Sequence, residues 1–160
     1  MAEQKTNVMR LLDQKKIKYT AREYPHSDAP VDGVTAAALM GQDHARVFKT
    51  LVARGASKKI YVFDIPAAAE LDLKKAAKAV GEKSIAMVHV SEITALTGYV
   101  RGGCSPVGMK KQYPTVFHDT AAGLDTVIVS AGRIGFQVEL APADLIGLVR
   151  GAYADITTEE

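Results

Sequence analysis

The stretch "RVFKTLVARGASKKIYVFDI", residues 46–65, holds the plainest structural signal in the chain. Two apolar runs, residues 47–53 and 60–65, flank the polar segment "RGASKK", whose Gly and Ser are typical of a turn. The pattern predicts a β-hairpin. Lys49 interrupts the first run, so it is either a side chain that extends from a sheet edge to solvent or a cation at the mouth of a pocket.

Helical periodicity appears on both sides of this hairpin. Glycines and a proline mark where several of these segments begin or end. The predicted helices are residues 7–14 after the N-cap Thr6, "VTAAALMG" ending at Gly41, "ELDLKKAAKAVG" with its apolar stripe (Leu71, Leu73, Ala76, Ala77, Val80) and its end at Gly81, "SEITALTG" with Ser91 as cap and Gly98 as end, and "APADLIGLVRG" between Pro142 and Gly151.

Further strands are expected between these helices. They are "KIKYTAREY", "SIAMVHV", "TVFHD", "DTVIVSAG" and "IGFQVEL", while "HSDAPVDG" has the composition of a loop. Because strands and helices are interspersed without a regular βαβ spacing, the sequence favours an α+β fold with a mixed sheet over a doubly wound one. We expect one domain spanning residues 1–160.

Composition excludes several classes of protein. The chain has 160 residues, 48% of them hydrophobic, and a net charge of +2, which argues neither for nor against a nucleic-acid partner. One cysteine, Cys104, cannot form an internal disulfide, and the first residues lack the apolar region of a secretory signal. These two features predict a cytoplasmic protein. No apolar run approaches the roughly 20 residues that span a bilayer, so a transmembrane segment is excluded.

The segment "GYVRGGCSPVGMKK" combines four glycines with a proline and has no periodicity. Such a loop brings backbone close to a ligand, but it lacks the Gly-Lys-Ser/Thr ending of a triphosphate-binding loop. Free N–H groups here, or at the Ser130-Ala131-Gly132 step, would stabilise an oxyanion, and Lys49 would hold a phosphate or polarise a carbonyl. This combination suits acyl-ester chemistry on a phosphorylated carrier. The alternative is a tight turn beside a solvent-facing lysine.

Cys104 is the obvious candidate nucleophile, with His89 or His118 as its base. A lone cysteine is more often a small buried apolar residue, which is the reading we favour. The histidines show no short ligand spacing, and one cysteine cannot complete a structural zinc set, so no metal is expected.

Four segments, "VFKTLV", "LDLKKAAKAVG", "TGYVRGGCSPVG" and "IVSAGRIGFQVELAPADL", resemble in order the YbaK/EbsC family of aminoacyl-tRNA deacylases. The resemblance covers nearly the whole chain and implies the editing-domain fold of prolyl-tRNA synthetases, a mixed, mainly antiparallel, barrel-like central β-sheet flanked by helices. It also implies hydrolysis of mischarged aminoacyl-tRNA without a cofactor. A second site of this kind is needed because apolar contacts discriminate a similar side chain by only about 1–3 kcal/mol.

The resemblance carries over to individual residues. Lys49 matches the family's essential lysine, Tyr24 its pocket tyrosine, Gly102 the loop facing the acyl carbonyl and Ser130 the serine of a turn; these form the implied catalytic set. The implied substrate-binding residues are Thr50, Gly98, Tyr99, Arg101, Gly103, Ser105, Gly108, Lys110 and Gln137. In this family the substrate's own cysteine thiol attacks its ester, so the protein supplies position and electrostatics.

Three positions depart from the pattern. Gln137 stands where close members carry aspartate, Ala131 where they carry glycine, and Cys104 where a branched apolar residue is usual.

The implied substrate is Cys-tRNA(Pro), with Cys-tRNA(Cys) as a second one. The alternatives are an Ala-tRNA(Pro) deacylase that uses water and a non-catalytic tRNA-binding module. The implied partners are aminoacyl-tRNA and prolyl-tRNA synthetase, and Arg101, Lys110 and Lys111 are either phosphate contacts or solvated charges.

Overall fold

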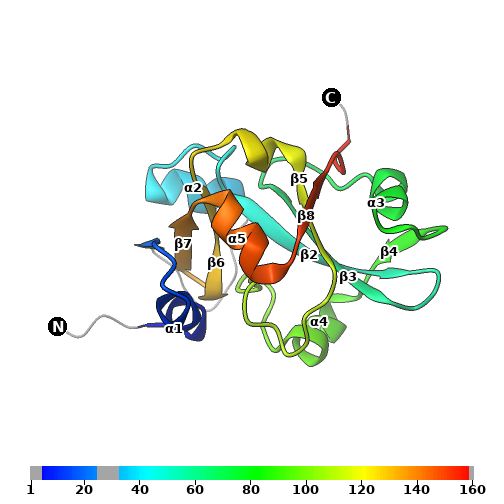
Figure 1. The fold of residues 1–160 in the computed structure, drawn as a ribbon, viewed down its shortest axis with the longest axis horizontal. Helices are drawn as coiled ribbons and strands as arrows, with labels where there is room; N and C mark the ends of the chain where they lie inside the picture. Colours follow the sequence, from blue (N-terminus) through cyan, green and yellow to red (C-terminus); the bar gives the residue numbers. More distant parts are fainter. Residues whose placement is uncertain (1–4, 25–32, 159–160) are drawn as a thin grey trace.

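The computed structural model describes residues 5–24 and 33–158, and within them helices and strands alternate irregularly, as an α+β fold requires (Figure 1). The predicted loop "HSDAPVDG" lies almost entirely outside the described residues. In chain order the elements are α1 Asn7–Gln14, β1 Thr20–Glu23, α2 Gly33–Met40, β2 Phe48–Gly55, β3 Ile60–Pro66, α3 Leu73–Val80, β4 Ile85–Met87, α4 Val90–Thr97, β5 Thr115–His118, the 3₁₀ helix η1 Asp119–Gly123, β6 Val127–Arg133, β7 Phe136–Leu140, α5 Pro142–Val149 and β8 Ala152–Ala154.

The strands form two sheets. The larger has the order β4-β2-β3-β5-β8, and the smaller has the order β1-β7-β6. Pairing is antiparallel except between β3, β5 and β8, which run parallel. A single bridge, Val47 to Ile128, joins the sheets. The mixed, mainly antiparallel fold class is therefore confirmed, although the strands of the described residues remain two sheets and do not close into a barrel.

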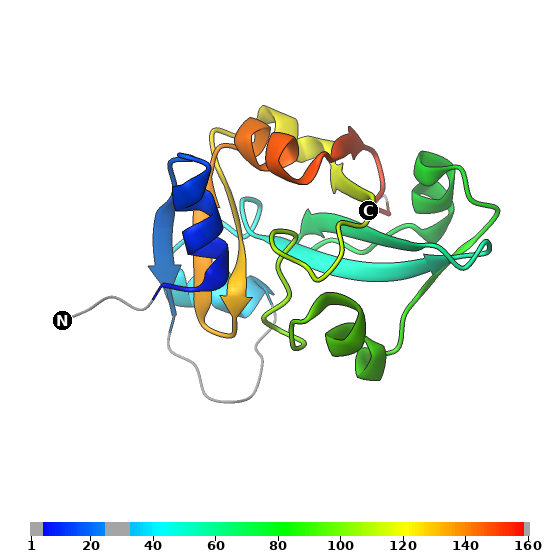
Figure 2. The same ribbon diagram turned by 60° about the horizontal axis from the view of Figure 1, so that its bottom comes forward.

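The hairpin of β2 and β3 is confirmed and forms the longest ladder of the larger sheet. Its register runs from Phe48 opposite Pro66 to Arg54 opposite Ile60. Lys58 has a φ of 76° in the turn, where the Gly55 N–H donates to the Lys59 carbonyl. The turn between β2 and β3 lies at one end of the hairpin, and the smaller sheet lies at the other end (Figure 2).

Most helix boundaries follow the capping signals. Thr6 accepts a hydrogen bond from the Met9 N–H at the start of α1, and Asp72 caps α3, which ends at Gly81. The predicted cap of α4, Ser91, is wrong: the N-cap is His89, because the Glu92 side chain reaches back to its N–H at 3.0 Å.

The core is divided by the sheets. One apolar cluster lies where α1 and α5 meet the smaller sheet, and another lies between the larger sheet and α3. Helices α3 and α4 lie on opposite faces of the larger sheet (Figures 1 and 2). Leu73, expected in the apolar stripe of α3, is 43% exposed, whereas Ala76 and Ala77 are buried. In the part of the chain that the structure describes, every helix is too short or too polar to cross a membrane.

Candidate active site

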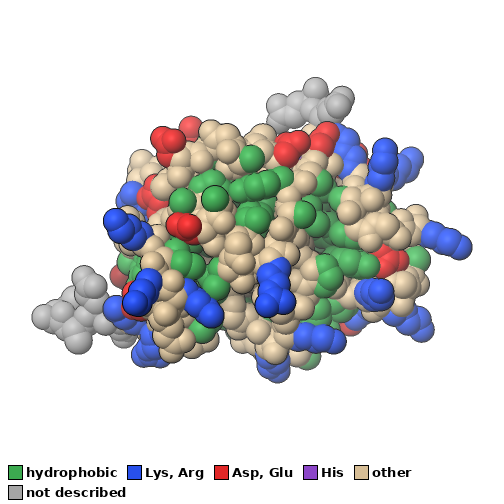
Figure 3. All heavy atoms as spheres, viewed as in Figure 1, with side chains coloured by type: hydrophobic (Ala, Val, Ile, Leu, Met, Phe, Trp, Pro, Cys, Tyr) green, Lys and Arg blue, Asp and Glu red, His purple; other side chains and the backbone are tan. Residues whose placement is uncertain are grey.

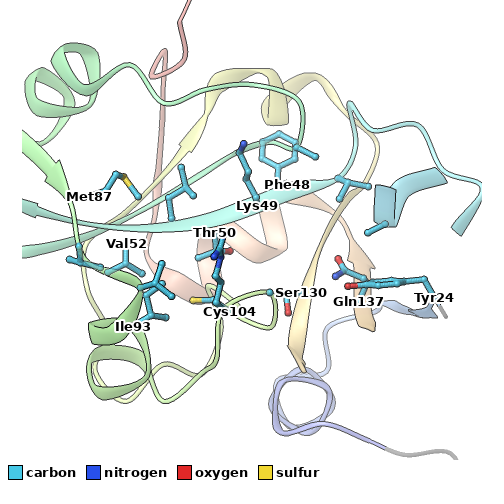
Figure 4. Close-up of a pocket in the computed structure, with 18 residues that line it drawn as sticks. Tyr24, Phe48, Lys49, Thr50, Val52, Met87, Ile93, Cys104, Ser130 and Gln137 are labelled. Carbon is cyan, nitrogen blue, oxygen red and sulfur yellow. The ribbon is translucent and has the colours of Figure 1, made fainter. Parts of the chain in front are cut away.

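A pocket of about 450 Å³ opens where the two sheets meet. Its wall is formed by β2, the start of α4, the loop of residues 98–108 and the paired strands β6 and β7 (Figure 4). Tyr24, which directly follows β1, also lines it. The pocket thus draws on both halves of the fold.

The pocket follows an open edge of β2. Strand β4 pairs with β2 only at residues 53–55, so the stretch 48–52 borders the pocket instead of another strand. Side chains from both faces of β2 therefore reach it, and Figure 4 shows Lys49 and Thr50 leaving the strand on opposite sides. Lys49 is partly buried at this edge. Lys49 was predicted to be either a solvent-facing edge residue or a cation at a pocket, and the structure places it in the pocket wall. It leaves β2 on the side opposite Cys104.

Backbone groups of β2 also face the pocket. The Gly55 N–H donates to the Lys59 carbonyl at 2.9 Å. Because backbone hydrogen bonds to an antiparallel partner occur at every second residue, the odd-numbered residues of β2 bond to β3 and the even-numbered ones do not. The N–H and C=O of Thr50 therefore point away from β3, toward the pocket. The same alternation directs the carbonyl of Val52 outward, where it accepts from the Val88 N–H.

Thr50 stands opposite Asp64 of β3, so their side chains share one face of the sheet. The Thr50 Oγ1 and the Asp64 Oδ1 are 2.5 Å apart. Asp64 is 0% exposed, and its Oδ2 has no hydrogen-bond partner among the described residues. Burial raises the pKa of the Asp64 carboxyl to about 8, although the hydrogen bond with Thr50 opposes the shift.

A second polar pair faces the pocket from the smaller sheet. Ser130 of β6 stands opposite Gln137 of β7, and the two are 8% and 6% exposed. The Ser130 Oγ accepts a hydrogen bond from the Gly132 N–H at 3.1 Å, next to an irregularity in the ladder. Tyr24 is tied to this turn, since its N–H donates to the Gly135 carbonyl at 3.0 Å.

The glycine-rich loop closes the pocket opposite the sheets. Gly102 has a φ of +85°, which a side chain would strain, and a Cβ on Gly103 would come within 3.2 Å of the backbone of Arg133 and Ile134. A side chain at position 103 would therefore force the β6–β7 turn to move away by a few tenths of an ångström. This packing places Arg101, Gly102 and Cys104 in the pocket wall.

Cys104 does not have the surroundings of a nucleophile. Burial is the main cause that raises the pKa of the Cys104 thiol to about 12, and the nearby carboxyl of Asp64 is the second cause. The thiol is therefore neutral at physiological pH. Neither proposed base lines the pocket: His89 caps α4 at the surface, and the His118 ring accepts from the Ile156 N–H at the far side of the larger sheet. Cys104 is thus a pocket-wall residue that lies away from both proposed bases.

The structure gathers part of the predicted set in the pocket. The expected residues that line it are Tyr24, Lys49, Thr50, Arg101, Gly102, Ser130 and Gln137. The others, which do not line it, are Gly98, Tyr99, Gly103, Ser105, Gly108 and Lys110.

The expected residues outside the lining give the loop its shape. The Tyr99 hydroxyl donates to the Val107 carbonyl at 2.5 Å, and burial raises the pKa of Tyr99 to about 12. The Ser105 Oγ accepts from the Val107 N–H at 3.2 Å. Lys110 packs its side chain beside Gly98 at the end of α4.

Two features of the site were not predicted. One is Asp64, although an acid inside the apolar run "IYVFDIP" is the same kind of anomaly as Lys49. The other is an apolar wall formed by Met87, Val90 and Ile93, which flank and begin α4. Three or more potential metal ligands do not cluster anywhere in residues 5–24 and 33–158.

Comparisons with known proteins agree on one family. Residues 29–148 match the model of the "Aminoacyl-tRNA editing domain". A relative from Enterococcus faecalis, described as "Putative Cys-tRNA(Pro)/Cys-tRNA(Cys) deacylase EbsC", is 46% identical over 158 residues, covering 99% of this chain and 96% of its own.

Two solved structures are similar in fold. One is described as "a putative trans-editing enzyme for prolyl tRNA synthetase", with 26% identity, a TM-score of 0.81 and coverage of 95% of each chain. The other, a hypothetical protein at 22% identity, has a TM-score of 0.84 over 94% of this chain and 99% of that one.

Proposed function

The chain belongs to the aminoacyl-tRNA editing domain family, and we propose that it is a trans-acting deacylase that removes cysteine from mischarged Cys-tRNA(Pro). The observation that carries the proposal is the open edge of β2, where Lys49 and Thr50 meet Gly102 and Ser130 around one pocket. In this reading residues 1–160 form one editing domain, and the charged tRNA on which it acts places the protein in the cytoplasm.

The pocket supports a reaction in which the substrate supplies the nucleophile. The protein's own thiol, Cys104, is held neutral, and no histidine of residues 5–24 and 33–158 lines the pocket beside it. In the proposed step the substrate's cysteine thiol loses its proton, its sulfur bonds to the ester carbonyl carbon, and the bond from that carbon to the ribose oxygen breaks. The ribose oxygen leaves with a proton, and the acyl group departs as a cyclic thioester.

Positive charge and oriented donors lower the barrier of that step. Negative charge develops on the ester oxygens, and a cation or N–H group already aimed there stabilises it without reorganisation. Lys49 and the backbone N–H of Gly102 are the groups we assign to this role, with Ser130 on the opposite wall. Tyr24 lines the same wall and bounds the acyl side chain.

Size and polarity of the pocket suit a small acyl group. A volume of about 450 Å³ accommodates an aminoacyl ester together with part of its ribose. The apolar wall of Met87, Val90 and Ile93 faces the side chain, and Gln137 presents a neutral amide. Because the residue at position 137 is uncharged, we propose that discrimination between cysteine and alanine depends on the reactivity of the substrate thiol.

The tRNA body would contact the surface around the pocket mouth. Arg101 lines the pocket, and Lys110 and Lys111 follow the same loop. On the face shown in Figure 3, Lys and Arg side chains are scattered from the middle to the edges and do not gather into one patch. On this face, affinity would come from the charged 3′ end more than from the body of the tRNA. Recruitment by prolyl-tRNA synthetase would offset such weak binding, and we propose that enzyme as a partner.

The test is deacylation of cysteinyl-, alanyl- and prolyl-tRNA(Pro) by the purified protein. The variant is Lys49→Ala, and Lys78→Ala, an exposed lysine of α3, is the matched control for loss of one positive charge. We expect the wild type and the Lys78→Ala control to release cysteine but neither alanine nor proline, and we expect Lys49→Ala to release none of the three. Loss of alanine would redirect the assignment to an Ala-tRNA(Pro) deacylase, and an intact ester in every case would indicate a binding module.

A further inference from the structure

Asp64 is a buried acid directly behind the pocket-lining residue Thr50, and the proposed reaction leaves it without a role. It lies in the middle of β3, is 0% exposed, and touches the pocket through Thr50, whose Oγ1 is 2.5 Å from its Oδ1. Thr50 in turn lines the pocket. A chain of two side chains therefore leads from a fully buried carboxyl to the substrate space.

The surroundings of Asp64 favour a neutral carboxyl. On β2 it faces the uncharged Thr50, its register partner on β5 is Phe117, and from the 98–108 loop it faces the thiol of Cys104. The pocket's cations, Lys49 and Arg101, are not among these contacts, and Lys49 leaves β2 on the other side. A charged carboxylate with one oxygen unbonded and no cation beside it is costly to bury.

The position of the acid proton follows from the same contacts. On Oδ2 it would be a buried donor with no partner among the described residues, whereas on Oδ1 it would have the Thr50 Oγ1, 2.5 Å away, as an acceptor. The remaining Oδ2 is then a neutral carbonyl oxygen, the least costly group to leave unbonded. A separation of 2.5 Å suits a hydroxyl-to-hydroxyl bond of this kind.

We propose that Asp64 is a positioning residue: its neutral carboxyl donates to Thr50, which leaves the Thr50 hydroxyl proton free to bond an acceptor oxygen of the substrate, the ester carbonyl. Ionised Asp64 would reverse the bond, because a carboxylate only accepts, and Thr50 would then present lone pairs to the pocket. Asp64 therefore sets whether the pocket offers a donor at this point. The role assigned to the substrate rests on the proposed deacylase function.

The experiment compares kcat/KM of the wild type and Asp64→Asn on cysteinyl-tRNA(Pro) from pH 6 to pH 9. The amide of asparagine has a donor for Thr50 at every pH, and the ratio of the two proteins cancels titration of the substrate. With a pKa of about 8, about a tenth of the acid is neutral at pH 9, so the ratio of wild type to variant should fall about tenfold from pH 7 to pH 9. A ratio that stays constant would overturn the proposal.

Thr50 supplies the matched control. In a Thr50→Val background the ratio should be flat with pH, and in Thr50→Ser it should fall as in the wild type, because serine keeps the hydroxyl. A fall that persists in the valine background would show that Asp64 acts through another group and would contradict the proposal. If Asp64→Asn does not fold, the pH dependence of kcat/KM can be compared directly among the wild type, Thr50→Val and Thr50→Ser.

A second readout does not need activity. Carbon-13 NMR of the aspartate carboxyls, with Asp64→Asn to assign the signal, should show one carboxyl that titrates near pH 8. Titration near pH 4 would overturn the neutral acid whatever the enzyme does. If the protein deacylates no tRNA but this carboxyl titrates near pH 8, the proposed function fails while the state of Asp64 stands.

Discussion

Two antiparallel strand pairs adjoin the same pocket, and each carries one cross-strand polar pair with at least one member in the pocket wall. Thr50 and Asp64 come from β2 and β3, while Ser130 and Gln137 come from β6 and β7. The geometry is the same, since directly opposite residues share one face of a sheet. The chemistry differs, because the first pair contains an acid that is 0% exposed and the second contains only neutral groups.

The difference assigns separate tasks to the two sheets. The pair on β6 and β7 has the same hydrogen-bonding character at every pH, so it suits recognition of the acyl group. The pair on β2 and β3 changes character when Asp64 ionises, and it adjoins Lys49, one of the two cations that line the pocket among the described residues. We therefore expect charge and pH effects to come from the larger sheet.

The largest expected effect is on stability. The pKa of Asp64 is raised to about 8, above its unfolded value of about 3.9, so between these values the folded protein holds a proton that the unfolded chain has lost. Wild-type stability should therefore fall by about 1.4 kcal/mol per pH unit relative to Asp64→Asn as pH rises from about 4 to about 8. Urea unfolding of both proteins at several pH values measures this. Parallel curves would contradict a buried neutral acid.

Replacement of Lys49 should give the largest kinetic effect. Lys49→Met keeps an apolar stem of similar length and removes the charge, so kcat/KM on cysteinyl-tRNA(Pro) should fall about 100- to 1000-fold. The thermal midpoint should change little. Wild-type kinetics in this variant would mean that Lys49 is a solvated edge lysine.

The two polar pairs can be compared directly by removing one hydroxyl from each. Thr50→Val should lower kcat/KM about tenfold at pH 7 and much less at pH 9, because at high pH the wild-type Thr50 has already lost its role as donor. Ser130→Ala should lower kcat/KM by the same factor at both pH values. Equal pH profiles for the two variants would erase the distinction between the sheets.

The smallest effect is expected at the cysteine. Cys104→Ala removes a thiol whose raised pKa, about 12, makes it a poor nucleophile, so kcat/KM should fall by less than about threefold. The rate is measured beside the circular dichroism spectrum. Complete loss of turnover with the fold intact would restore Cys104 as nucleophile.

Local signals predicted much of the fold. The two apolar runs around "RGASKK" gave the hairpin of β2 and β3, and Thr6 and Gly81 marked helix ends correctly. Strand β8 was missed because it has only three residues and pairs in parallel with a distant strand. Division of the strands into two sheets depends on long-range pairing, which no local pattern reports.

The site was predictable where one residue broke a pattern. Lys49 in an apolar run, the glycines around position 102 and the Ser130-Ala131-Gly132 step pointed to the pocket, and family resemblance added Tyr24 and Gln137. Asp64 was missed because its importance depends on burial and on Thr50 across the strand pair. Tyr99 and Ser105 were expected to bind substrate, but the hydrogen bonds that their side chains form with Val107 lie within the loop. Sequence position alone could not separate residues that shape the loop from those that line the pocket.

The most direct measurement is single-turnover deacylation of cysteinyl-tRNA(Pro) beside seryl-tRNA(Pro), which differs by one sulfur-to-oxygen exchange. If the pocket supplies position and charge and the substrate supplies the nucleophile, the cysteinyl ester should react at least about a hundredfold faster, since a thiol is far more easily deprotonated than a hydroxyl. Equal rates for the two esters would show that the attacking group comes from water or from the protein, and would contradict the thiol-assisted editing reaction.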